Sequence, residues 1–127
     1  MVECGYLYSI GMRDHTKLRA FELADRLAVL VYRGTRDFPR GEHFGLVAQM
    51  RRAAVSTASN IVEGCGRHTK ADYVRFLDMA YGSVRELEYQ ITLSIRLGYL
   101  VKDSELVSAS QETAKVLHGL IRSLRNA

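Results

Sequence analysis

One apolar stripe at helical spacing runs through residues 69–97 and limits the fold more than any other feature of the sequence. Thr69 followed by Asp72 is the capping-box pattern of a helix start, and Gly98 suits the helix end. At 1.5 Å per residue this helix would be about 43 Å long. The stripe occupies one side, which predicts burial against other helices. Its members are Tyr73, Phe76, Leu77, Ala80, Val84, Leu87, Ile91 and Ile95.

Three further segments carry the same periodicity, and we expect helices over about residues 17–35, 42–65 and 104–125. The single proline, Pro39, ends the first of them because it disfavours helical geometry at Phe38. Sandwiches and barrels need many turns rich in proline and glycine, so one proline favours long helices with short loops. The sequence therefore predicts an all-α fold, an antiparallel up-down-up-down four-helix bundle.

The chain of 127 residues fits one domain. Residues 1–16 show no sustained period and are expected to form a loosely ordered extension, with the bundle in residues 17–127. No stretch reaches the roughly 20 apolar residues of a membrane span, and the N-terminus lacks the pattern of a secretory leader. Two cysteines, Cys4 and Cys65, are too few for a disulfide framework. A cytoplasmic location with reduced thiols follows as an expectation.

The second predicted helix has an unusual composition, since its middle is built of small side chains and a polar line follows one face. Serine and asparagine are poor helix formers, so their presence there needs a reason. We interpret this line as interhelical or intersubunit hydrogen bonding, with Arg52 or Arg67 pairing to Glu63, because a polar line can fix oligomer state. Gly64 and Gly66 are expected to end the helix with positive φ. The candidate oligomer-interface residues are Gln49, Ser56, Asn60 and Glu63.

Arginine supplies 14 of the 18 cationic residues, and the net charge is +4. A guanidinium group suits bidentate pairing with phosphates or carboxylates, so this bias fits either nucleic-acid contact or ion pairs across an interface. Tyr73 and Phe76 belong to the predicted core and do not serve as stacking platforms on the surface. The candidate nucleic-acid-binding residues, around the second helix and the turn after it, are Arg51, Arg52, Arg67, Lys70 and Arg75.

We find no pattern that predicts catalysis. Di-iron bundles use Glu-x-x-His pairs, and none of the four histidines has an acidic residue three positions earlier. Zincin, phosphate-loop and dinucleotide motifs are absent. Cys65 is expected near a helix C-terminus, where the dipole opposes a thiolate. The sequence predicts no catalytic residue, no metal, no cofactor, no small-molecule substrate and no enzymatic activity.

Several segments together resemble the 23S rRNA intervening-sequence proteins, a family of four-helix-bundle proteins. The resemblance spans about residues 17–125. It departs from the family pattern in the first helix, where Phe21 occupies the region in which a tryptophan is common, and at Thr57, where a proline often follows the serine. The matching segments are Phe38-Pro39, Gln49 to Ser56, Asn60 to Arg67, Phe76-Leu77, Ala80, Gly82-Ser83, Glu86 to Glu88 and Leu97 to Leu100.

The resemblance implies a small bacterial homo-oligomer, with a ring-like pentamer as the expected form. The family name records a genomic location within large ribosomal RNA genes and defines no activity. Similar bundles serve as accessory proteins to reverse transcriptases, where a basic surface contacts nucleic acid. We therefore expect a non-enzymatic homo-oligomer that binds RNA, DNA or a nucleic-acid-processing partner through arginine-rich surfaces. The alternative is a structural or protein-interaction module that binds no nucleic acid.

Overall fold

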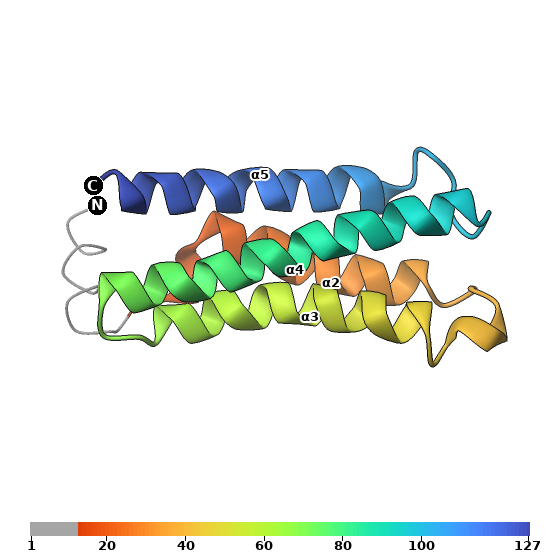
Figure 1. The fold of residues 1–127 in the computed structure, drawn as a ribbon, viewed down its shortest axis with the longest axis horizontal. Helices are drawn as coiled ribbons and strands as arrows, with labels where there is room; N and C mark the ends of the chain where they lie inside the picture. Colours follow the sequence, from red (N-terminus) through yellow and green to blue (C-terminus); the bar gives the residue numbers. More distant parts are fainter. Residues whose placement is uncertain (1–12) are drawn as a thin grey trace.

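The computed structural model describes residues 13–127, which contain four α-helices and no strand. Each helix runs opposite to the one before it, so the α2–α3 and α4–α5 connections share one end of the bundle (Figure 1). The α3–α4 turn lies at the other end, together with the C-terminus. This arrangement confirms the predicted all-α, four-helix-bundle fold. The helices are α2 (Arg19–Gly34), α3 (Leu46–Cys65), α4 (Lys70–Arg96) and α5 (Glu105–Arg125), with two short 3-10 helices, η1 (His15–Lys17) and η2 (Arg40–Glu42).

The core runs along the whole axis of the bundle. α3 packs against α2 and α4, and α5 packs against the same two helices. Each helix contributes a side chain with no solvent exposure, and examples are Leu27, Met50, Leu87 and Leu117. Full burial of a Leu or Met side chain stabilises the fold by about 1.5–3 kcal/mol. The predicted stripe of α4 is this core face, since Tyr73, Leu77 and Val84 are completely buried.

Both ends of α4 match the prediction, and α5 also begins with a side-chain cap. Thr69 Oγ1 accepts a hydrogen bond of 3.1 Å from the backbone N–H of Asp72, which starts α4. Ser104 Oγ accepts one of 3.2 Å from the N–H of Leu106, which starts α5. Gly98 has a φ of +82° and ends α4 in the left-handed conformation that glycine adopts without strain.

The start of α3 differs from the prediction. The helix begins at Leu46, and Glu42 instead lies in η2, four residues earlier along the α2–α3 connection. Gly45 interrupts the helical path with φ −112° and ψ −106°. The Glu42 carboxylate does not serve the helix start, because it accepts a 2.8 Å hydrogen bond from the Tyr99 hydroxyl.

The two glycines near the end of α3 match the prediction only in part, since Gly66 caps the helix but the predicted positive φ is wrong. Gly64 lies within the helix, and Gly66 has a φ of −87°, so neither residue adopts positive φ. Gly64 is needed for close packing, since a Cβ there would lie 3.0 Å from the Cβ of Phe76 and 3.2 Å from the Tyr73 ring. The glycine lets α3 and α4 approach closely where the two helices meet.

Residues 13–16, the last part of the predicted extension, pack on the bundle. Arg13 is 8% exposed, its guanidinium carbon lies 4.2 Å from the centre of the Tyr73 ring, and Nη1 donates to the Arg67 carbonyl at 2.7 Å. Asp14 caps η1, and its hydrogen bonds from the Thr16 hydroxyl and N–H lower the pKa of its carboxyl. Residues 1–12 lie outside the part of the chain that the structure describes.

Candidate nucleic-acid and subunit interfaces

The structure separates the five predicted nucleic-acid-binding residues into two groups. Arg51 and Arg52 lie in the second turn of α3, whereas Arg67, Lys70 and Arg75 surround the α3–α4 turn. Because an α-helix rises 1.5 Å per residue, Arg52 and Arg67 are about 20 Å apart. The two groups lie toward opposite ends of the bundle and cannot form one compact patch.

The group at the α3–α4 turn, which we call the paired end (Arg67, Lys70 and Arg75), is held by protein groups. Arg67 Nη2 lies 3.5 Å from the Glu63 carboxylate, and its guanidinium carbon lies 4.4 Å from the centre of the Phe76 ring. Arg75 pairs with Asp72 at 3.1 Å and lies 4.6 Å from the centre of the same ring. Lys70 Nζ donates to the carbonyl of Ala127 at 3.1 Å. The contact between Arg67 and Glu63 is the one that the sequence suggested.

Arg51 and Arg52 differ from each other in burial. Arg51 is half-buried, and it joins α3 to α2 by donating to Thr35 Oγ1 at 3.1 Å and to the Tyr32 carbonyl at 3.2 Å. Its guanidinium carbon lies 4.6 Å from the centre of the Tyr32 ring, which adds a cation–π contact. Arg52 is exposed and donates to the side-chain carbonyl of Gln49. Arg51 thus has a structural role, while Arg52 stays accessible.

Sequence reasoning missed three arginines near these two. Arg33, Arg36 and Arg40 are exposed, and their side chains have no hydrogen-bond or ion-pair partner among residues 13–127. The signal was visible as three arginines within a short segment around the Pro39 turn. Residues 32–52 contain five arginines against two carboxylates, Asp37 and Glu42. We call this surface the arginine end (Arg33, Arg36, Arg40, Arg51 and Arg52).

The predicted oligomer-interface line forms hydrogen bonds within the chain. Ser56 Oγ lies 2.9 Å from Ser83 Oγ of α4, and the Asn60 side-chain amide donates to the Ser56 carbonyl at 2.9 Å and hydroxyl at 3.0 Å. Gln49 and Glu63 hold Arg52 and Arg67, as described above. The Ser56–Ser83 contact is thus an interhelical hydrogen bond of the predicted kind. Ser56 and Asn60 are half-buried at the surface.

Exposed apolar side chains on α4 extend this surface, and the sequence analysis did not identify them. Met79 is 46% exposed and precedes Ser83 by one helical turn, which places it beside the Ser56–Ser83 contact. Tyr89 is 62% exposed. The available signal was a second line at helical spacing on the side of α4 away from the core: Met79, Gly82, Glu86 and Tyr89.

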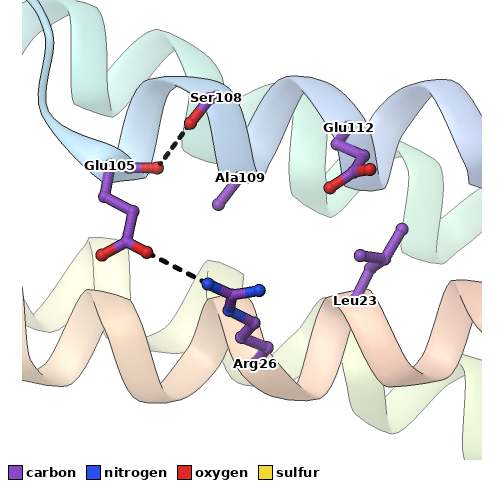
Figure 2. A pocket seen from close by; sticks show the side chains of 6 residues that line it. All are labelled: Leu23, Arg26, Glu105, Ser108, Ala109 and Glu112. Carbon is purple, nitrogen blue, oxygen red and sulfur yellow. Dashed lines mark hydrogen bonds and ion pairs between the residues drawn. The ribbon is translucent and has the colours of Figure 1, made fainter.

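A groove between α2 and α5 is smaller than typical small-molecule sites. It measures about 100 Å³, whereas sites for small molecules span roughly 300–1,000 Å³. Figure 2 shows Arg26 of α2 reaching Glu105 of α5, and the two form an exposed ion pair at 3.1 Å. Leu23, Ala109 and Glu112 line the rest of the groove. Arg26 and Glu105 pair across the groove, Ser108 donates to the Glu105 carbonyl within α5, and Glu112 pairs with Arg19 outside the groove.

Three further observations concern the residues that the structure describes. No group of three or more metal-ligating side chains occurs within residues 13–127. Cys65 is buried, with 1% exposure, and lies in the last turn of α3. In the same part of the chain, no helix has both the length and the apolar character required to cross a membrane.

These features define a small antiparallel four-helix-bundle protein whose distinctive groups lie on its outer surface and at its ends. The chain belongs to the 23S rRNA-intervening sequence protein family, whose family model matches residues 16–119. This result confirms the family resemblance that the sequence motifs indicated.

A solved structure supports the fold. The chain is similar to a protein of unknown function from the S23 ribosomal protein family of Bacteroides thetaiotaomicron, with a TM-score of 0.73 and 24% sequence identity. The similarity covers 81% of this chain and 98% of the other. Among curated proteins, no sequence matches.

Proposed function

We propose that the protein is a non-enzymatic homo-oligomer of the cytoplasm that binds RNA or DNA through its arginine end. The observation that carries this proposal is the set of exposed guanidinium groups of Arg33, Arg36 and Arg40, which have no side-chain partner within residues 13–127. Such groups can pair with phosphate oxygens without first breaking an internal ion pair. At the paired end, a phosphate would have to compete with Glu63 and Asp72.

Self-association is the second part of the proposal. Met79 and Tyr89 expose apolar surface on α4 beside the polar line of Ser56 and Asn60 on α3. Exposed apolar groups next to partly buried polar groups are typical of subunit contacts. The family resemblance favours a ring of five subunits, which would repeat the arginine end around the ring and raise the avidity for a polyanion.

Salt-dependent binding tests the nucleic-acid part of the proposal. The purified protein would be titrated into structured RNA and duplex DNA over a salt series. The test variant reverses two charges at the arginine end, Arg36→Glu with Arg40→Glu, and we expect weaker binding and a salt slope lower by up to about 2 for DNA. Reversal of Arg51 is less informative, because Arg51 also joins α3 to α2.

A matched variant controls for net charge. Lys115 and Arg122 of α5 are exposed and have no side-chain partner among residues 13–127, so Lys115→Glu with Arg122→Glu changes the net charge equally. Equal losses of binding in both double variants would show a general charge effect and remove the arginine end from the proposal. Absence of binding by the unmodified protein at low salt would leave the alternative, a structural or protein-interaction module.

Light scattering tests the subunit contact. Asn60→Leu and Glu63→Ala, together with Met79→Glu, should change the mass of the assembly with little change in helix content. Lys115→Glu on α5 is the control and should leave the mass unchanged. An unchanged mass in all three test variants would exclude this surface as the subunit contact.

A further inference from the structure

The most exposed large apolar side chain of the described residues is that of Phe44, in the connection between η2 and α3. Its exposure is 101%, compared with 5% for Phe38 and Phe76. Phe44 lies between Gly45 and the η2 helix, at the same end of the bundle as the arginine end. Exposure of a phenylalanine ring to water is unfavourable, and aromatic residues are enriched in binding interfaces relative to the rest of the surface.

The segment that carries Phe44 is held in a defined shape. The N–H groups of Glu42, His43 and Gly45 donate to the carbonyls of Pro39, Arg40 and Glu42 at 2.9, 3.2 and 3.1 Å. From the α4–α5 connection, the Tyr99 hydroxyl donates to Glu42 at 2.8 Å. The Tyr99 ring also lies 5.2 Å from the buried Phe38 ring, centre to centre. The ring of Phe44 is therefore presented to solvent on an ordered segment, which lowers the entropy lost on binding.

The surroundings of Phe44 are cationic. Arg40 begins the same η2 turn, and Arg36 lies on the same connection. A second aromatic ring, Tyr32, is 45% exposed and carries the Arg51 guanidinium over its face. Exposed rings among cationic side chains match the surfaces that bind single-stranded nucleic acids, where arginines follow the phosphates and aromatic rings stack on unpaired bases.

From this arrangement we infer that Phe44 stacks on an unpaired base of a single-stranded nucleic acid whose phosphates contact Arg36 and Arg40. This inference rests on the proposed function and extends it by naming the ligand class as single-stranded RNA or DNA with accessible bases. A base in a regular duplex presents no free face to the ring. The stacking contribution is neutral and therefore should not depend on salt, unlike the phosphate contacts.

The experiment compares Phe44→Leu with Phe44→Tyr in the full chain. Leucine keeps an apolar side chain but removes the aromatic face, whereas tyrosine keeps the face. Val101→Ala is the matched control, because Val101 is 66% exposed in the α4–α5 connection at the same end. Binding would be measured by fluorescence anisotropy with oligouridylate, oligothymidylate and a duplex of equal length, over a salt series.

We expect Phe44→Leu to weaken binding to single strands by about fivefold or more, equally at all salt concentrations, and to leave duplex binding unchanged. Phe44→Tyr and Val101→Ala should bind like the unmodified chain. The ratio of affinities for oligouridylate and oligothymidylate shows whether the ligand is RNA or DNA.

Three results would overturn the inference. If the unmodified chain binds nucleic acid and Phe44→Leu binds single strands equally well, stacking is wrong while the proposed function stands. If Phe44→Leu changes the mass in light scattering, Phe44 belongs to a protein contact. If the unmodified chain binds no nucleic acid at low salt, the proposed function fails as well.

Discussion

At the paired end of the bundle, the guanidinium groups of Arg67 and Arg75 lie over the buried Phe76 ring and pair with Glu63 and Asp72. At the arginine end, Arg36 and Arg40 extend into solvent, and the Phe44 ring is fully exposed. Each end thus combines arginine with phenylalanine. The two ends use these residues differently. At the paired end they stabilise the turn between α3 and α4, whereas at the arginine end their side chains remain available to a partner.

The comparison teaches that residue type does not decide the role of an arginine. Both groups contribute to the same net charge and to the same bias of composition. The difference depends on whether carboxylates and a buried ring are within reach after folding. An internally paired guanidinium is less available to a phosphate than an unpaired one, because the phosphate must replace the existing ion pair.

The two phenylalanines give the largest expected difference. Phe76→Ala should lower the free energy of unfolding by about 3–5 kcal/mol, because the ring is 5% exposed and packs in the core. Phe44→Ala should change it by less than about 0.5 kcal/mol, because the ring makes no buried contact. Urea unfolding followed by circular dichroism measures both values. Comparable destabilisation by the two variants would contradict the proposed contrast between the ends.

Two glycine-to-alanine substitutions test the close packing of α3 and α4 at the paired end. Gly64→Ala should destabilise the fold by about 1–3 kcal/mol, because the new Cβ would lie 3.0 Å from the Cβ of Phe76 and 3.3 Å from the Tyr73 carbonyl. Gly119→Ala in α5 is the control, since no atom lies within 4 Å of the added Cβ. Alanine there should stabilise the helix by roughly 0.5–1 kcal/mol. If Gly64→Ala is neutral in urea unfolding, α3 and α4 can separate without loss at this turn.

Substitutions of the arginines at the two ends should differ less in their effect on the free energy of unfolding. Arg75→Gln removes an ion pair with Asp72 and a cation–π contact with Phe76, and we expect a loss of about 0.5–1 kcal/mol in the free energy of unfolding. Arg36→Gln should be close to neutral, because its side chain has no partner among residues 13–127. High salt should reduce the effect of Arg75→Gln. An effect of Arg36→Gln as large as that of Arg75→Gln would show that the arginine end also stabilises the fold.

The smallest expected effect concerns the contact that orders the Phe44 segment. The hydrogen bond to Glu42 raises the pKa of Tyr99 above its ordinary value of 10.0, with burial as a second cause. The bond favours the neutral phenol, so its contribution to stability is complete below pH 10 and is lost as the pH rises through the raised pKa. The stability difference between the unmodified chain and Tyr99→Phe should therefore disappear in alkali. A difference that is independent of pH would exclude the Glu42 contact as its source.

The four helices and both ends of α4 could be predicted from the sequence because they depend on neighbours along the chain. The stripe of α4, the Thr69 cap and the positive φ of Gly98 all follow from spacing and local backbone chemistry. The start of α3 could not be predicted in this way. Gly45 breaks the helical path just before α3, and Glu42 instead accepts a hydrogen bond from Tyr99, which is far along the chain.

The candidate surfaces likewise depend partly on local sequence and partly on tertiary packing. The sequence by itself determined an all-α bundle of the 23S rRNA-intervening sequence protein family and a surplus of arginine, because periodicity and composition are properties of the chain. Only the tertiary structure decided which arginines are paired, that Ser56 meets Ser83 across two helices, and that Phe44 is exposed while Phe76 is buried. The physical reason is that ion pairs, ring contacts and burial depend on distances between helices, which form only when the bundle packs.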